Sequence, residues 1–274
     1  MSPRDHGTLF LLLLALLVLF GWMTPISSPQ TVSEVSAPFI YSFNAPGVLQ
    51  EASSARESSS PYWFLDSGGV LTISDGQGAT IQGALPVNDR WRRAYAASNP
   101  LDTDNGAHPQ NLFRLLTKGS WENADMEVEF MITADNLSAS ENRNESNGVF
   151  LMSRYRDQDT LYYAGIRVDG TAVIKKKYQG TYSTLAQEPL FSGTYSAATP
   201  DLLPHKEWLS LRSVVETRAD GTVSVSLYLG QKGELWRPVA RATDTALPIT
   251  GSGVSGIRSD FVDLVFKNVR ITPL

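Results

Sequence analysis

Residues 147–186 bring cationic and aromatic side chains together among short apolar runs. Side chains alternate between the faces of paired strands, so a two-residue turn at Asp169-Gly170 would place several of them on one face. That face would carry Arg154, Tyr163, Arg167, Lys176 and Tyr178, opposite an apolar face with Ala164, Ile166, Val168 and Val173. Aromatic rings stack on sugar faces, while Arg and Lys bind hydroxyls and carboxylates. The pattern predicts a glycan-binding face, with ordinary solvated strand residues as the alternative interpretation.

The same residue types could also catalyse an elimination. A polysaccharide lyase neutralises the uronate carboxylate with a cation and abstracts a proton with Tyr or His. Tyr163 or Tyr178 could supply the base, and His108 and His205 each lie beside a proline in an expected loop. A lyase acting on an anionic glycan is therefore the alternative to a non-catalytic binding protein.

A second candidate site consists of acidic residues with the spacing of one strand face. Asp125, Glu127 and Glu129 alternate with the apolar residues Met126, Val128 and Phe130. Two carboxyl groups on one strand face could serve a retaining glycosidase. The alternative interpretation is an ordinary strand whose acidic face points to water and whose other face is packed. For this reason a hydrolase is less favoured than a lyase.

Composition excludes several other chemistries. The chain has 23 Lys and Arg against 28 Asp and Glu, a net charge of −5, which argues against nucleic acid as a partner. The absence of cysteine excludes disulfides and Cys-ligated metals. No His, Asp and Glu cluster has transition-metal spacing, so no metal site is predicted. Gly251 to Gly256 matches a dinucleotide fingerprint, but a strand-like segment follows it, which indicates turn glycines.

The elements that would position these residues are short strands. From Phe39 onward, β-rich runs alternate with Gly-containing turns at Asp75-Gly76, Asp169-Gly170, Gln179-Gly180 and Asp220-Gly221. Val223, Val225, Leu227 and Leu229 alternate with polar residues, as in a strand with one packed face. We expect an all-β fold, a two-sheet antiparallel sandwich over 39–274, with irregular loops at 88–111 and 134–147.

An apolar run from Leu9 to Met23 indicates a targeting segment. We expect residues 1–26 to be a signal peptide or a signal anchor, forming one hydrophobic helix, and residues 27–38 to be a linker. Arg4 precedes the run and no Lys or Arg follows until Arg56, which places the body outside the cytoplasm. The expected location is extracytoplasmic, secreted or attached to the membrane through the N-terminal segment.

Three stretches of the chain carry a resemblance to a known superfamily. They are Tyr41-Ser42-Phe43 with Trp63, then Gly148 to Leu151 with Leu161-Tyr162-Tyr163, and finally Gly256-Ile257-Arg258-Ser259 leading into Val265 to Ile271. The order resembles the concanavalin A-like lectin and glucanase superfamily, in its laminin-G-like and polysaccharide-lyase-like branch. The resemblance implies a jelly-roll sandwich with a polysaccharide or glycan ligand, and it covers binding modules, glucanases, lyases and protein-interaction modules of the laminin-G type.

The resemblance bears on cofactors too. A structural calcium ion is common near the sandwich edge of this superfamily, and Asp263 resembles one of its ligands. No other cofactor is expected. The interpretation that accounts for most of these features is an extracytoplasmic carbohydrate-binding protein without catalysis, because fold alone does not choose among the activities.

Overall fold

The computed structural model describes residues 35–231 and 235–274. The expected targeting segment at 1–26 and most of the linker lie outside these residues, so both stay predictions. No helix within the described residues combines the length and the apolar character needed to cross a bilayer.

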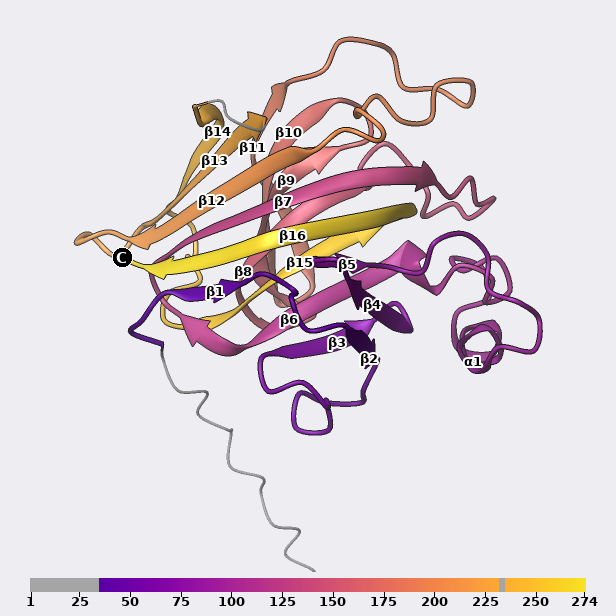
Figure 1. Ribbon diagram of the computed structural model, residues 1–274. Helices are drawn as coiled ribbons and strands as arrows, with labels where there is room; N and C mark the ends of the chain where they lie inside the picture. The colour runs from indigo at the N-terminus through magenta and orange to yellow at the C-terminus, as the bar shows by residue number, and fades with distance from the viewer. Residues whose placement is uncertain (1–34, 232–234) are drawn as a thin grey trace, which may run out of the picture. The chain divides into compact units, whose positions relative to one another are not determined.

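The described chain forms two antiparallel sheets packed face to face (Figure 1). The nine-stranded sheet runs β14-β13-β12-β7-β16-β5-β4-β2, with β1 paired to β16. Its strands are β1 (Phe39–Tyr41), β2 (Gly47–Gln50), β4 (Val70–Ser74), β5 (Gln77–Ala79), β7 (Ala124–Asp135), β12 (Leu209–Thr217), β13 (Val223–Gln231), β14 (Arg237–Asp244) and β16 (Val262–Pro273).

The seven-stranded sheet runs β11-β10-β9-β8-β15-β6-β3. Its strands are β3 (Trp63–Ser67), β6 (Leu112–Trp121), β8 (Gly148–Asp157), β9 (Thr160–Arg167), β10 (Thr171–Tyr178), β11 (Thr181–Pro189) and β15 (Gly253–Asp260). The all-β sandwich that the sequence predicts is therefore confirmed.

The core lies between the two sheets and follows the alternation of the strands. Val223, Val225 and Leu227 on β13 are all fully buried, as the sequence predicts. On β7, Met126, Val128 and Phe130 point into the same core, while the acidic residues between them are partly exposed. Burying each such side chain contributes roughly 1.5–3 kcal/mol, so dense packing replaces the missing disulfides.

Two of the predicted hairpin turns have the expected two-residue loops. Asp75 and Gly76 have φ of 52° and 75°, and they connect the paired residues Ser74 and Gln77. Gln179 and Gly180, with φ of 48° and 81°, do the same between β10 and β11. Positive φ at both central residues is the geometry of a tight hairpin.

The turn between β9 and β10 differs from the prediction. Arg167 and Thr171 flank a three-residue loop, Val168-Asp169-Gly170, in which the Gly170 amide donates to the Arg167 carbonyl over 2.9 Å. Gly170 has φ of 79°, which places it in the left-handed position that ends a three-residue hairpin loop. The extra loop residue shifts the register by one, and a one-residue shift moves every side chain of the strand to the other face.

The segment 88–111 is more regular than predicted, because it contains α1 (Arg90–Ser98) and the short 3₁₀ helix η1 (Pro109–Asn111). Asp89 caps α1 by accepting hydrogen bonds from the Trp91 and Arg92 amides. The helix docks through Tyr95, whose hydroxyl donates to Glu51 over 2.6 Å. Only Tyr95 of this nine-residue helix is buried, so the sequence carries no sustained apolar stripe from which the helix could be predicted. The loop 134–147 does lack regular elements after β7 ends at Asp135, as predicted.

Candidate functional site

The register of β9 and β10 decides which side chains share a face. Lys175 pairs with Tyr163, and Lys176 pairs with Tyr162. Tyr162 belongs to the core between the sheets, whereas Tyr163 lies in a separate cluster on the outer face of the seven-stranded sheet. The prediction that Lys176 and Tyr178 share a face with Tyr163 is therefore wrong, and Lys175 takes that place.

Lys176 instead belongs to a buried polar cluster between the sheets. Its ammonium lies 2.8 Å from Asp244 Oδ2 and donates to the Ala246 carbonyl over 2.5 Å. The Tyr162 hydroxyl donates to the same carboxylate over 2.6 Å. Tyr178 packs against the margin of the core. Both predicted residues thus have structural roles.

The two predicted arginines are also occupied by the protein itself. Arg154 is 1% exposed and donates to the Glu122 and Ile249 carbonyls over 2.9 and 2.7 Å. Arg167 does share the outer face with Tyr163, but its guanidinium donates to the Glu145 carbonyl and pairs with Asp169 at 2.9 Å. Of the five predicted residues, only Tyr163 borders an open cleft.

That cleft, of about 520 Å³, lies on the outer face of the seven-stranded sheet. Its floor and walls come from six strands, β6, β8, β9, β10, β11 and β15, from two loops, and from Phe261 between β15 and β16. The lining residues are Asp102, Leu112, Asn142, Asn144, Ser146, Asn147, Phe150, Tyr163, Lys175, Tyr182, Arg258, Asp260 and Phe261.

Aromatic rings form one side of the cleft. Tyr163 and Tyr182 stack with their centroids 6.3 Å apart and an angle of 23° between the rings. Tyr182 is 54% exposed, so its ring is available to a ligand, while Tyr163 is buried beneath it. Phe150 lies beside Gly165, where any larger side chain would meet the Val149 carbonyl and the Phe150 ring. The glycine allows β9 to pack closely against β8 beside the Phe150 ring.

Two cations face these rings. Arg258 donates to the Tyr163 hydroxyl over 3.0 Å and to Asp260 over 2.9 Å, and its guanidinium lies 5.3 Å from the centre of the Tyr163 ring. Burial opposes its charge, but the Asp260 carboxylate holds the pKa of Arg258 above its usual value. Burial, with a smaller effect from Arg167, lowers the pKa of Lys175. Both cations line the cleft, together with the carboxylates of Asp102 and Asp260.

The two tyrosines titrate in opposite directions. Burial raises the pKa of Tyr163 to about 12. Burial opposes ionisation of Tyr182 as well, yet the charges of Arg258 and Lys177 bring the pKa of Tyr182 below its usual value. Tyr182 is therefore the more readily ionised of the pair.

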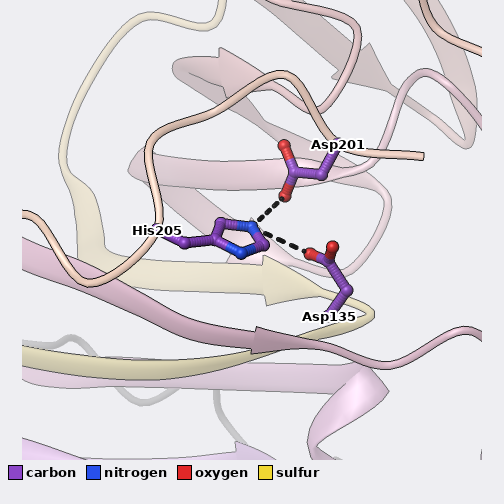
Figure 2. A group of neighbouring side chains, drawn as sticks. All are labelled: Asp135, Asp201 and His205. Carbon is purple, nitrogen blue, oxygen red and sulfur yellow. Dashed lines mark hydrogen bonds and ion pairs between the residues drawn. The ribbon is translucent and has the colours of Figure 1, made fainter. Parts of the chain in front are cut away.

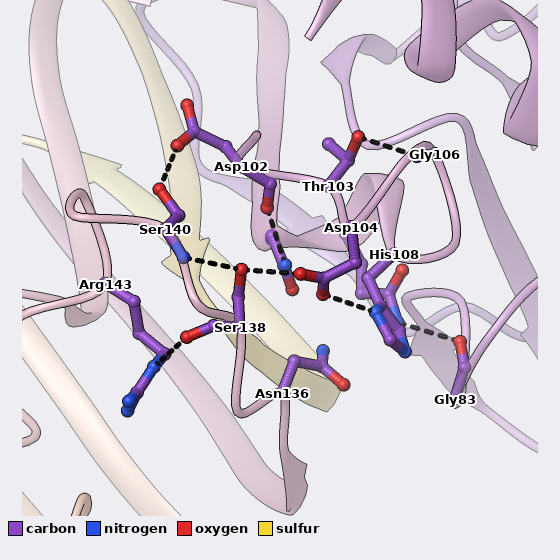
Figure 3. A network of polar contacts seen from close by, with 12 residues as sticks. Gly83, Asp102, Thr103, Asp104, Gly106, His108, Asn136, Ser138, Ser140 and Arg143 are labelled. Atoms are coloured by element: carbon purple, nitrogen blue, oxygen red, sulfur yellow. Dashed lines mark hydrogen bonds and ion pairs between the residues drawn. The ribbon is translucent and has the colours of Figure 1, made fainter. Parts of the chain in front are cut away.

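Two loops, one with Asp102 and Asp104 and the other with residues 138–142, lie at one end of the cleft. Hydrogen bonds connect them (Figure 3). Ser138 donates to Asp104 over 2.7 Å, and Ser140 and Asn142 both donate to Asp102. His108 contacts the other oxygen of Asp104 at 2.8 Å. This network holds Asp102 and Asn142 at the rim, with oxygen and amide groups that can bind hydroxyls.

The sequence analysis missed most of the cleft. A two-residue turn at Asp169-Gly170 would place Lys175 on the apolar face, and no motif of the sequence singles out Tyr182. Arg258 stands in one of the stretches that carry the superfamily resemblance, which was the available signal for it. Asp102 and Asn142 come from loops whose approach to the sheet depends on tertiary structure.

Asp263 does not fit the calcium ligand that the resemblance suggests. Its Oδ1 accepts hydrogen bonds from Gln110 and Asn136 over 2.8 and 2.9 Å, and its Oδ2 accepts one from the Gly83 amide over 2.6 Å. Calcium takes oxygen ligands, whereas three N–H donors point at this carboxylate. Asp263 therefore connects three segments of the chain.

The acidic residues of β7 face outward from the nine-stranded sheet, as predicted. Asp125 forms a two-point contact with Arg212, the shorter distance being 2.6 Å. Glu129 lies 3.6 Å from Lys267. Burial and the neighbouring Asp125 raise the pKa of Glu127. Each outer acid thus lies near a cation, which agrees with a solvated strand face.

No protein-family model and no curated protein matches the chain. Solved structures similar to it include the carbohydrate binding module CBM66 from Bacillus subtilis, at 16% identity and a TM-score of 0.44, covering 76% of this chain and 94% of the module. A mutant of the GH43 protein BlXynB from Bacillus licheniformis matches at 10% identity and a TM-score of 0.49, covering 86% of this chain and 39% of that one.

The exoplasmic/lumenal domain of VIP36 in its Ca²⁺-bound form matches at 13% identity and a TM-score of 0.39, covering 87% of this chain and 90% of that one. At these identities and TM-scores the matches carry no argument about the superfamily or the activity of this chain. Any activity has to be argued from the side chains of this chain.

Proposed function

We propose that the chain is an extracytoplasmic carbohydrate-binding protein that holds a glycan in the cleft on the seven-stranded sheet without cleaving it. The observation that carries the proposal is the stacked pair of Tyr163 and Tyr182 beside the cations Lys175 and Arg258. Attachment to the membrane through the N-terminal segment belongs to the same proposal and rests on the apolar run of the sequence.

The exposed ring of Tyr182 provides a flat apolar surface for one face of a sugar. Lys175 and Arg258 favour an acidic sugar, since a carboxylate placed among them gains charge-assisted hydrogen bonds. Asn142 and Asp102 at the rim would pair with hydroxyl groups. The Lys175 side of the cleft therefore fits an acidic group of a glycan, while Asp102 and Asp260 favour hydroxyl groups elsewhere in the cleft.

Isothermal titration with uronate oligosaccharides tests this function directly. Tyr182→Ala removes the exposed ring and Lys175→Ala removes a cation. Each is expected to weaken binding about 5- to 150-fold, since a stacked ring or a charged hydrogen bond contributes roughly 1–3 kcal/mol. Tyr62→Ala is the matched control, because Tyr62 is 52% exposed but does not border the cleft. Unchanged binding in both cleft variants would disprove the proposed site.

A second candidate function, a lyase, is favoured by one observation. The Tyr182 hydroxyl has a lowered pKa beside Arg258, so it ionises more readily. The resulting phenolate would accept the proton while the arginine neutralises the uronate. Unsaturated uronate products absorb in the ultraviolet. A rise in absorbance that Tyr182→Phe abolishes would replace the binding proposal, and flat traces over several uronate polymers would remove the lyase.

A further inference from the structure

Three side chains from two distant parts of the sequence converge at a place apart from the cleft cations. Asp135 ends β7, and Asp201 and His205 lie between β11 and β12. One ligand atom of each residue lies within 4.8 Å of the others. Figure 2 shows the two carboxylates approaching the same ring nitrogen of His205 from different directions.

Hydrogen bonding does not satisfy this group. His205 Nε2 lies 3.2 Å from Asp135 Oδ1 and 3.3 Å from Asp201 Oδ2, whereas charge-assisted hydrogen bonds are usually about 2.7–2.9 Å. A single N–H cannot point at both oxygens. Asp135 Oδ1 is enclosed by the protein and accepts no hydrogen bond from any described donor. An enclosed carboxylate oxygen whose close partner is one N–H shared with a second carboxylate is incompletely satisfied, which favours a further partner.

The distances suit a shared metal ion. Imidazole nitrogen and carboxylate oxygen bind zinc at about 2.0–2.2 Å, so two ligands of one tetrahedral ion lie about 3.3–3.4 Å apart. The two nitrogen–oxygen distances from His205 are close to that value. The measured spacing therefore agrees better with ligands of one ion than with short ion pairs.

The surrounding structure holds the ligands in place. The Leu203 amide donates to Asp201 Oδ1 over 2.7 Å, which leaves Oδ2 directed at His205. The Lys206 amide donates to the Ile132 carbonyl over 2.8 Å and fixes the histidine beside β7. The Asp201 side chain is 1% exposed and that of His205 is 35% exposed, so one side of the group opens to solvent. Water could enter there as a further ligand.

We propose that Asp135, Asp201 and His205 form a binding site for a divalent transition-metal ion such as zinc. An imidazole with two carboxylates favours these ions over calcium and magnesium, which prefer ligand sets made of oxygen. The ion would fasten the β11–β12 connection to the end of β7. Asp135 also borders a small cavity with Asn144 and Asn147, and both asparagines reach the glycan cleft. The proposal does not depend on what the cleft binds.

Zinc titration of the full chain, after treatment with a chelator, tests the site by calorimetry. We expect one ion per chain, and Asp135→Asn and His205→Gln should each weaken binding at least about tenfold. His108→Gln is the matched control, because His108 also pairs with an aspartate four residues away, Asp104 at 2.8 Å, without a third ligand. Circular dichroism checks that each variant folds.

Three outcomes would overturn the proposal: no zinc binding, binding that both ligand variants retain, or binding that His108→Gln removes. Any of these would leave an ion pair between His205 and its two carboxylates. Cobalt provides a readout without mutation, since visible absorption bands typical of tetrahedral nitrogen and oxygen ligation are expected in the unaltered chain. If both variants unfold, the absence of those bands decides against the site.

Discussion

Lys175 of β10 lies directly opposite Tyr163 of β9, and the neighbouring Lys176 lies opposite Tyr162. Two adjacent lysines therefore point to opposite sides of one sheet. Lys175 borders the cleft, whereas Lys176 is 5% exposed and pairs with Asp244 between the sheets. Lys175 is therefore available for binding, whereas Lys176 has a structural role.

Lys176→Met is expected to destabilise the fold by about 3–5 kcal/mol, because it leaves the buried Asp244 without its cation. Lys175→Met should change stability little and should weaken binding of an anionic glycan. Urea unfolding and titration calorimetry on both variants measure the contrast. The assignment fails if the two substitutions exchange effects.

Tyr182→Phe keeps the ring and removes the hydroxyl. For a binding protein, affinity should stay within about threefold of the unaltered chain, since stacking depends on the ring rather than on the hydroxyl. For a lyase, turnover should fall by roughly 10²–10⁴, which is what general base catalysis contributes. Parallel affinity and absorbance measurements separate the two functions.

Affinity for an anionic glycan should decrease as the pH rises into the alkaline range. Burial lowers the pKa of Lys175, so this residue loses its charge at a lower pH than an ordinary lysine. Tyr182, with its lowered pKa, gains a negative charge in the same direction. Titrations across this range should show the decrease, and it should be smaller in Lys175→Ala.

The lowered pKa of Lys175 should affect stability in the opposite direction, so that stability increases with pH while affinity decreases. A folded pKa below the unfolded one means that the unfolded chain binds more protons between the two values, so stability should rise slightly with pH there. Urea unfolding of the ligand-free chain at several alkaline pH values checks the sign. A slope unaffected by Lys175→Ala would assign the effect to other groups.

Gly165→Ala tests the close packing of β8 against β9. The added methyl would lie 2.1 Å from the Val149 carbonyl oxygen, so the strand has to shift at a cost of about 1–3 kcal/mol or more. Gly47→Ala on β2 is the control, since no atom lies within 4 Å of its added methyl. Equal stability of the two variants, measured by thermal unfolding, would contradict the close packing of β8 and β9.

Local patterns determined the fold class. The alternation in β7 and β13 and the Gly-containing turns at Asp75-Gly76 and Gln179-Gly180 predict strands, their buried faces and tight hairpins, because each depends on neighbouring residues alone. The absence of cysteine excludes disulfides, so packing and strand pairing hold the two sheets together. The charge of −5 likewise made the cations of residues 147–186 an exception to examine.

Tertiary structure decided the register and the sites. The packing of β9 and β10 in the sandwich decides whether Val168 belongs to the strand or to the loop. The position of that one residue determines whether Lys175 or Lys176 reaches the cleft. Asp135 meets Asp201 and His205 only because β7 passes beside the β11–β12 connection. Sequence spacing carries no information about such contacts, since the sheets assemble them across the chain.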